Sequence, residues 1–134
     1  MFLGIDYGRK RVGIAIGEKI AFSRGFIIND QYLLGQIIEI IKEDNVKAVI
    51  IGWPTKDSGK DGELVEEIKV LGEKIKSEVD VEIVFEEESD TTFVAHHLLK
   101  EAGLGISESK SQVDALAAAT ILQQYLDQRN KKIK

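Results

Sequence analysis

The chain has 134 residues, of which 43% are apolar and 31% charged, and its formal net charge is −5. This length is typical of one globular domain that buries its own hydrophobic core. No apolar run reaches the roughly 18 to 20 residues that span a bilayer, and no charged leader precedes the first apolar run. The absence of cysteine excludes disulfides, thiol catalysis and a cysteine zinc site. We therefore expect a cytoplasmic protein that makes no contact with a membrane.

Charge is distributed unevenly along the chain. Residues 1–24 carry five basic side chains against two acidic ones, and residues 126–134 carry four against one. Residues 73–90 carry eight acidic side chains against two basic ones. The negative total argues against a protein that coats nucleic acid in general, but this distribution permits a basic surface beside an acidic pocket. Solvated surface charge is the alternative explanation for each run.

Apolar periodicity and turn residues predict nine elements. In chain order they are strands at residues 2–5, 11–16 and 20–28, a helix capped by Asn29 or Asp30 that ends near residue 44, a strand at 46–51, a helix at 63–77, a strand at 79–85, a helix from Asp90 or Thr91 to Lys100, and a helix at 111–128. Residues 52–62 are expected to form a polar loop that is long for a simple connection. Residues 129–134 form a basic tail that we expect to fray.

This order predicts an α/β domain over residues 1–128. Three early strands without an intervening helix indicate an antiparallel meander, and the alternating βα units that follow indicate parallel strands. We expect three layers around a mixed five-stranded sheet, in which the first, fourth and fifth strands are parallel. Ligands bind at the carboxyl ends of such strands. The segments at Asp6, Trp53 and Glu87/Glu88 should therefore meet at one edge.

Two acidic residues occupy positions where packing alone does not explain them. Asp6 directly follows an apolar strand, where a charge is costly unless it is paired or bound to metal; it could instead cap the turn that Gly8 permits. Asp114 shares a helical stripe with Ala118 and Ile121, which should face the sheet. The alternative for Asp114 is an acidic residue in the first helical turn, favoured by the helix dipole.

Carboxylates that come together repel one another unless a divalent cation neutralises them. Oxygen ligands from two strand ends and one helix suit Mg²⁺ or Mn²⁺. Two such ions activate a water molecule and stabilise the leaving oxygen in phosphodiester hydrolysis. The basic run Arg9-Lys10-Arg11 would then bind phosphate. This combination favours a nuclease centre.

Three blocks of this sequence resemble the YqgF family of Holliday-junction resolvase-like proteins, which are described as pre-16S ribosomal RNA nucleases. The blocks are Asp6-Tyr7-Gly8-x-Lys10-Arg11-x-Gly13-x-Ala15, Gly52-x-Pro54 with Gly59 and Gly62, and Val113-Asp114-x-Leu116-Ala117-Ala118. The resemblance spans nearly the whole chain. It implies an RNase H-like fold and metal-dependent cleavage of structured nucleic acid. The implied substrates are precursor ribosomal RNA, cut at the 5′ end of 16S rRNA, or a four-way DNA junction.

The resemblance also implies the site residues. The catalytic metal ligands are Asp6, Glu88 and Asp114, holding Mg²⁺ or Mn²⁺ as two ions, with Glu87 as the alternative to Glu88. The nucleic-acid contacts are Arg9, Lys10, Arg11, Lys56, Thr91 and Thr92. Ser89 stands where the family has Arg, so either phosphate contact is weakened or Arg9 or Lys56 replaces that cation.

Other interpretations remain open at this stage. Ser89 is compatible with a non-catalytic RNA-binding factor in ribosome assembly. An Asp-x-Gly hairpin such as that at Asp6 also opens the actin and sugar-kinase fold, but that fold requires a much longer chain. Trp53 either packs in its loop or stacks on a base. His96 and His97 point to different sides of a helix, which is poor geometry for a metal site. The expected oligomeric state is a monomer or a homodimer.

Overall fold

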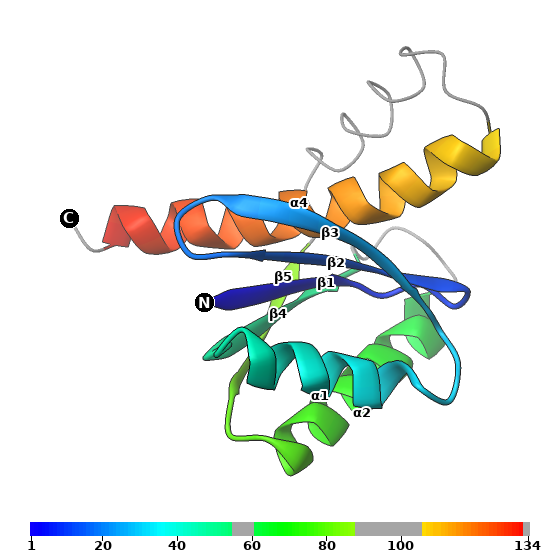
Figure 1. The fold of residues 1–134 in the computed structure, drawn as a ribbon, viewed down its shortest axis with the longest axis horizontal. Coiled ribbons are helices and arrows are strands. Elements are labelled where there is room, and N and C mark those ends of the chain that lie inside the picture. The colour runs from blue at the N-terminus through cyan, green and yellow to red at the C-terminus, as the bar shows by residue number, and fades with distance from the viewer. Residues whose placement is uncertain (55–60, 88–105, 133–134) are drawn as a thin grey trace.

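The computed structural model describes residues 1–54, 61–87 and 106–132, and it describes side chains for all of these except residues 61, 106–115 and 131–132. Its elements (Figure 1) are β1 (Phe2–Asp6), β2 (Arg11–Gly17), β3 (Ala21–Ile28), α1 (Leu33–Glu43), β4 (Ala48–Trp53), α2 (Asp61–Glu78), β5 (Glu82–Glu87) and α4 (Ile106–Lys132). The predicted helix from Asp90 or Thr91 to Lys100 lies outside the described residues.

The strands form one sheet in the order β3-β2-β1-β4-β5. β2 pairs antiparallel with β1 and with β3, whereas β4 pairs parallel with β1 and with β5. The predicted mixed sheet, with an antiparallel meander and three parallel strands, is therefore confirmed. The meander forms because two short turns join its strands, and the parallel strands form because α1 and α2 provide the crossovers.

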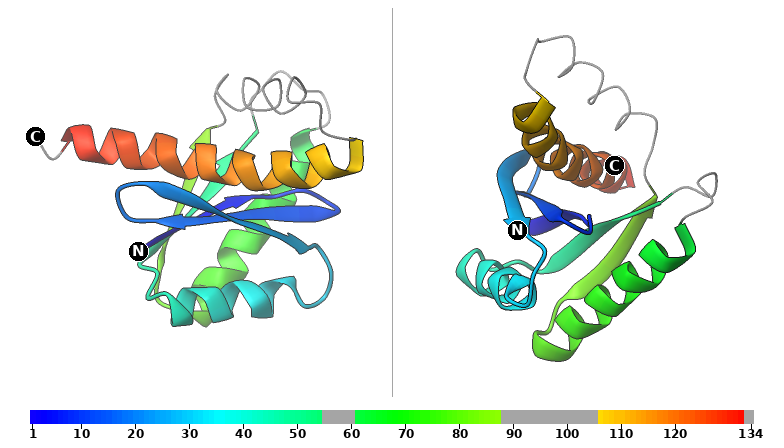
Figure 2. Two further views of the ribbon diagram at one scale, coloured as in Figure 1. Left: turned by 45° about the horizontal axis from the view of Figure 1, so that its top comes forward. Right: turned by 90° about the vertical axis from the view of Figure 1, so that its right-hand side faces the viewer.

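Helices cover both faces of this sheet (Figures 1 and 2). α1 and α2 lie on one face, and α4 crosses the other. Side chains alternate along β1 accordingly, since successive residues of a strand point to opposite faces. Leu3 packs in the core layer that contains Ile37 of α1 and Ile68 of α2. Phe2 packs in the other layer, against Leu122 of α4. The domain therefore has the three layers that the sequence predicts.

The start of α1 differs from the prediction. Tyr32, rather than Asn29 or Asp30, occupies the N-cap position and makes no side-chain cap bond. Asp30 instead accepts a hydrogen bond from the backbone N–H of Tyr32 at 2.9 Å through its carboxylate. The Leu33 N–H donates to the Asp30 carbonyl oxygen at 3.1 Å. Asp30 thus closes a turn before the helix, which is the other position that short acidic side chains favour.

Two strands have boundaries that lie two or more residues from the predicted ones. β4 continues through Trp53, so this residue belongs to the sheet and not to the following loop. β5 begins at Glu82 and not at Val79. The Val79 N–H donates to the Ile75 carbonyl and the Val81 N–H donates to the Val79 carbonyl, so these residues turn the chain out of α2 before pairing begins.

The last helix is longer than its predicted range of residues 111–128. α4 runs from Ile106 to Lys132, and Arg129 lies over the ring of Phe2, with its guanidinium carbon 5.0 Å from the ring centroid. Helical structure therefore continues into the segment that we expected to fray. The division into a domain of residues 1–128 and a tail stays a prediction. None of the helices in the described ranges is long and apolar enough to cross a membrane.

Candidate active site

The parallel strands end at one edge of the sheet, where the candidate site begins. β1 ends at Asp6, β4 at Trp53 and β5 at Glu87. The register pairs Ile51 with Ile5 and with Phe85, so these three ends lie at nearly the same height. The predicted convergence of three segments on one edge is confirmed for these strands. The predicted ligand Glu88 directly follows β5 and lies outside the described residues.

Asp6 lies on the face of the sheet that α4 covers. Phe2 packs with α4, and alternation places Gly4 and Asp6 on the same face as Phe2. Asp6 is half-buried and takes part in polar or electrostatic contacts. It is also the last residue of its strand, so a carboxylate there can meet ligands from the helix above it. This position is compatible with the metal-ligand role that the resemblance implies for Asp6.

β5 presents a carboxylate to the same face. The side-chain amide of Gln124 in α4 donates to Oε2 of Glu86 at 2.8 Å and to the backbone carbonyl of Glu87 at 3.0 Å. These two bonds tie the end of β5 to α4. They also satisfy Glu86, whose place in the strand corresponds to that of Asp6, since Ile51 is level with both Ile5 and Phe85.

The direction of α4 over the sheet indicates where position 114 lies relative to Asp6. Phe2 lies against Tyr125, with ring centroids 5.7 Å apart. Gly4, two residues further along β1, lies under Ala118 and Leu122. The helix therefore runs antiparallel to β1, and two residues of strand correspond to about one helical turn. Position 114 is one turn before Ala118, in the direction of Asp6. The side chain of Asp114 lies outside the described residues.

Close packing of α4 on β1 depends on Gly4. A Cβ atom at this position would lie 2.7 Å from Cβ of Leu122 and 3.0 Å from the carbonyl oxygen of Ala118. Both distances are shorter than an ordinary carbon contact. The absence of a side chain at position 4 therefore lets the helix that carries Asp114 approach the strand that carries Asp6.

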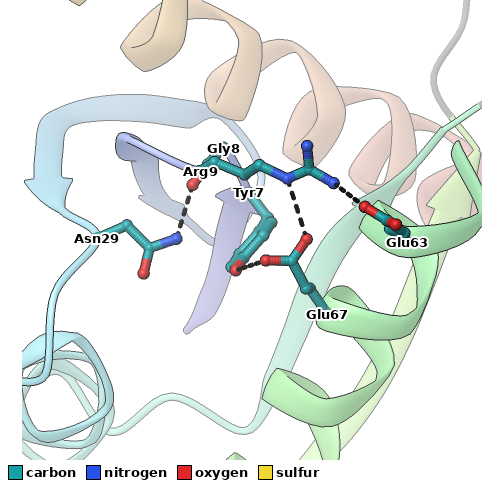
Figure 3. Close-up of polar contacts among 6 residues, drawn as sticks. All are labelled: Tyr7, Gly8, Arg9, Asn29, Glu63 and Glu67. Atoms are coloured by element: carbon teal, nitrogen blue, oxygen red, sulfur yellow. Dashed lines mark hydrogen bonds and ion pairs between the residues drawn. The ribbon is translucent and has the colours of Figure 1, made fainter. Parts of the chain in front are cut away.

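The loop after Asp6 is held in place from two sides (Figure 3). On one side, Nε of Arg9 lies 3.1 Å from Oε2 of Glu67, and its Nη2 lies 3.4 Å from Oε2 of Glu63. The hydroxyl of Tyr7 donates to Oε1 of Glu67 at 3.3 Å. On the other side, the amide of Asn29 donates to the carbonyl of Gly8 at 2.8 Å. The first block is thus connected to α2 and to the end of β3.

Gly8 is required in this loop by a close approach of two backbone segments. A Cβ atom on Gly8 would lie 2.5 Å from the carbonyl oxygen of Arg11, a contact that no side chain can make. Gly8 does not have a positive φ; among the described glycines that conformation occurs at Gly25. The predicted tight turn is therefore present, and its need for glycine is steric.

The three basic residues of the first block have different surroundings. Arg9 is engaged by the two carboxylates of α2 while its side chain remains 54% exposed. Lys10 is exposed. Arg11 is half-buried, and its guanidinium carbon lies 5.8 Å from the ring centroid of Phe26. The predicted contacts Lys56, Thr91 and Thr92 lie outside the described residues.

Trp53 is half-buried and packs against neighbouring side chains. Its ring meets that of Phe85 edge to face with centroids 5.0 Å apart, and Nζ of Lys69 lies 5.8 Å from the centroid of the Trp53 ring. It also contacts the core layer under α1 and α2. The structure favours the packing role of Trp53 over the stacking role.

The described side chains include no group of three or more His, Asp or Glu residues that could hold a metal ion. Of the predicted ligands, Asp6 has a described side chain on the face of α4, whereas the side chains of Glu88 and Asp114 lie outside the described residues. Glu87, the alternative to Glu88, is exposed and pairs with Trp53, which packs against the layer of α1 and α2, so Glu87 lies on the other face of the sheet. The described part of the site therefore provides one of the predicted oxygen ligands on the face of α4. The carboxylate oxygens of Asp6 are the type of ligand that a hard divalent cation prefers.

The sequence profile described as "RuvX: Holliday junction resolvase" matches residues 1–128. The chain belongs to the RuvX family. A relative from Acetivibrio thermocellus named "Putative pre-16S rRNA nuclease" is 35% identical over 139 residues, which cover 96% of each chain. A relative of the same name from Ehrlichia canis is 34% identical and covers 93% of this chain and 83% of its own length. RuvX and YqgF denote one family, so the resemblance in the sequence is confirmed.

The fold of this RuvX-family chain has a known counterpart. The solved structure described as "T. thermophilus RuvC in complex with Holliday junction substrate" superposes with a TM-score of 0.60. The superposition covers 97% of this chain and 95% of that chain at 16% sequence identity. A second structure of Thermus thermophilus RuvC gives a TM-score of 0.56 at 13% identity. The predicted RNase H-like fold is confirmed.

Sequence patterns did not predict several contacts of the site. Glu63 and Glu67 were expected only on a helix, and they meet Arg9 across 54 and 58 residues of chain. A spacing of four residues between two acids is a signal that both lie on one helical face. It does not indicate which loop that face meets. Phe26 beside Arg11 was missed because only the pairing of β2 with β3 brings them together.

Proposed function

We propose that this protein is a divalent-metal-dependent nuclease that hydrolyses phosphodiester bonds of structured RNA, and that its substrate is the precursor of 16S ribosomal RNA, cut near the 5′ end in the cytoplasm. Membership of the RuvX family and the names of the relatives from Acetivibrio thermocellus and Ehrlichia canis support this proposal. The single structural observation that carries it is the place of Asp6, at the carboxyl end of β1 and on the face covered by α4.

Asp6, Glu88 and Asp114 are the proposed metal ligands. The course of α4 supports this set, because the helix passes over Gly4 before it passes over Phe2, so the preceding turn, which contains position 114, lies in the direction of Asp6. Glu88 comes two residues after Glu86, which bonds to α4 through Gln124. Carboxylate oxygens from a strand, a second strand end and a helix suit Mg²⁺ or Mn²⁺. Such ions, when bound, supply an activated water and stabilise the leaving oxygen.

The remaining proposed residues bind and orient the substrate. Lys10 is exposed and can bind phosphate by charge alone. Arg9 has five N–H donors, of which Nε and Nη2 are directed to Glu67 and Glu63. Phosphate can replace Glu63, since that pair is long and its carboxylate side chain is 90% exposed. Arg11, Lys56, Thr91 and Thr92 complete the proposed nucleic-acid contacts.

The test is metal-dependent cleavage by the Asp6→Asn and Asp114→Asn variants on a precursor rRNA fragment. Both should reduce cleavage in Mg²⁺ or Mn²⁺ to background while the midpoint of thermal unfolding stays within a few degrees of the wild type. The matched control is Asp80→Asn, because Asp80 is exposed and precedes β5 at the opposite edge of the sheet. Cleavage by Asp6→Asn at the wild-type rate would contradict the metal site.

A second candidate function is the resolution of four-way DNA junctions. The description of the matching family as a Holliday junction resolvase favours it. A junction has two strands to cut, so this activity requires two copies of the chain, whereas RNA processing does not. Cleavage rates on a four-way DNA junction and on the precursor rRNA fragment, measured with the mass of each complex, distinguish the two.

A non-catalytic assembly factor is the remaining alternative, and Ser89, which replaces a family Arg, supports it. Such a factor would bind precursor rRNA with the same affinity in EDTA and in Mn²⁺ and would never cleave it.

A further inference from the structure

An exposed aromatic ring lies in line with Asp6 across the sheet. The register pairs Asp6 of β1 with Gly13 of β2, and Gly13 with Phe26 of β3. Neighbouring strands are about 4.8 Å apart, which places Phe26 about 10 Å from Asp6. Gly13 lies between them and contributes no side chain. Nothing carried by β2 therefore separates the Phe26 ring from the carboxylate in this row.

Phe26 is on the same face of the sheet as Asp6. Its neighbour Ile27 pairs with Val12, and both pack towards the core layer of α1 and α2. Alternation along β3 therefore directs Phe26 and Ile28 to the face of α4. Phe26 is 39% exposed and Ile28 is 53% exposed. Large apolar side chains at such exposure, close to a candidate active site, are typical of a surface that binds a partner or substrate.

A basic side chain lies beside this ring. The guanidinium carbon of Arg11 lies 5.8 Å from the Phe26 centroid, and Arg11 pairs with Ile28 in the register. Lys10 is exposed next to Arg11 in the chain. Arginine and an aromatic ring together are a common surface for a nucleobase, since the ring stacks on the base and the cation attracts the phosphates. A partner protein with an apolar surface would not need this charge.

From this arrangement we propose that Phe26, with Arg11 beside its ring, is a substrate-positioning surface that stacks on an unpaired nucleobase next to the phosphodiester bond to be cut. The inference rests on the proposed nuclease function and adds a feature of its substrate, namely an unpaired nucleotide at the cleavage point. Phe26 does not touch the reacting atoms; it fixes the substrate strand relative to Asp6. Phe26 therefore replaces Trp53 as the residue proposed to stack on a base, because the Trp53 ring packs against Phe85.

The test measures base stacking directly, in EDTA, where no metal-dependent cleavage occurs. The probe is a single-stranded oligoribonucleotide in which 2-aminopurine, a base whose fluorescence falls when it stacks, is placed at successive positions. The wild type should quench the fluorescence at one or two adjacent positions. Phe26→Leu should abolish this quenching and weaken binding about fivefold or more. Phe26→Trp should retain both, because it keeps an aromatic ring.

The matched control is Phe22→Leu. Phe22 lies on the same strand and is 63% exposed, but it pairs with Ile16, which packs in the core layer of α1 and α2. It therefore faces away from Asp6, and its replacement should change quenching and affinity less than twofold. Thermal unfolding of each variant shows that the fold is retained.

Three outcomes overturn the inference. They are wild-type quenching by Phe26→Leu, equal losses in Phe26→Leu and Phe22→Leu, and absence of binding by the wild type. Failure of the proposed function has a different signature. If the wild type cleaves no substrate in Mg²⁺ or Mn²⁺ while Phe26-dependent quenching persists, then the nuclease proposal fails and the base-stacking surface remains.

Discussion

Replacing Gly4 with alanine tests whether close contact between β1 and α4 is required for the site. Gly4 lies in the middle of β1, two residues before Asp6, and α4 passes directly over it. A Cβ atom added at this position would lie 2.7 Å from Cβ of Leu122 and 3.0 Å from the carbonyl oxygen of Ala118. Carbon atoms in good contact are about 3.5–4.0 Å apart. The helix must therefore move away from the strand by roughly 1 Å to accommodate a single methyl group.

The expected cost follows from this overlap. The atoms that the methyl group meets belong to a β-carbon and to the backbone of a helix, so neither can turn aside as the end of a flexible side chain could. Overpacking of this kind destabilises proteins by about 1–3 kcal/mol. For a domain of this size, a loss of 1 kcal/mol lowers the midpoint of thermal unfolding by about 4 °C. Gly4→Ala should therefore lower the midpoint by about 4–12 °C.

If α4 carries a metal ligand, Gly4→Ala should slow cleavage by more than its loss of stability explains. Displacement of α4 from β1 would separate Asp114 from Asp6 and weaken the binding of Mn²⁺. We expect Gly4→Ala to cleave more slowly than the wild type at limiting Mn²⁺ and to recover part of the rate at high Mn²⁺. The measurements are thermal unfolding followed by circular dichroism and the rate of cleavage as a function of Mn²⁺ concentration, at a temperature where the variant is folded.

The matched control is Gly35→Ala in α1. A Cβ atom at Gly35 would meet nothing within 4 Å, and alanine stabilises a helix by about 0.5–1 kcal/mol relative to glycine. This variant should therefore raise the midpoint while leaving cleavage unchanged. An unchanged or raised midpoint for Gly4→Ala would refute the steric reasoning. A lowered midpoint with an unaltered dependence on Mn²⁺ would refute the link between helix position and the metal site.

Three further changes have outcomes that can be measured. Glu63→Gln removes a carboxylate that competes with phosphate for Arg9, so it should strengthen RNA binding about twofold at low salt and have no effect at high salt, as measured by fluorescence anisotropy; weaker binding would contradict the competition. Trp53→Ala removes the edge-to-face contact with Phe85 and should lower the free energy of unfolding by about 2–3 kcal/mol without altering quenching of 2-aminopurine in RNA; loss of the quenching would restore the stacking role of Trp53. Asp30→Ala removes the hydrogen bond to the N–H of Tyr32 and should cost about 0.5–1.5 kcal/mol in chemical denaturation; an unchanged free energy would show that the turn before α1 forms without it.

Local sequence was sufficient for the elements and their order. The run from Phe2 to Ile5 is apolar at every position, so it predicts a strand buried on both faces, and Asp6 marks its end. The helical stripe of Ala117, Ala118 and Ile121 predicts the face of α4 that meets the sheet, and these residues are buried. Both patterns depend on residues close in the chain, because burial of a face requires only the correct period. The antiparallel meander and the three parallel strands followed from the sequence of element types.

Capping and boundaries were predicted less well, since several residues near an element's end can satisfy the same backbone groups. Asn29 or Asp30 was predicted to cap α1, but Tyr32 occupies the N-cap position and Asp30 closes the turn before it. The basic residues after Gln128 were predicted to fray, yet α4 continues, and Arg129 packs over Phe2. The stabilising contact is with a residue at the other end of the chain, which a local pattern does not contain.

The sequence alone thus determined the strand that carries Asp6, the helix that carries Asp114, and the family to which both motifs belong. Only the tertiary structure decided how residues far apart meet around this strand. Arg9 is held by Glu67 across 58 residues, and Phe26 comes level with Asp6 through the register of β1, β2 and β3. Periodicity predicts which face a side chain occupies, but register and helix direction depend on packing over the whole domain.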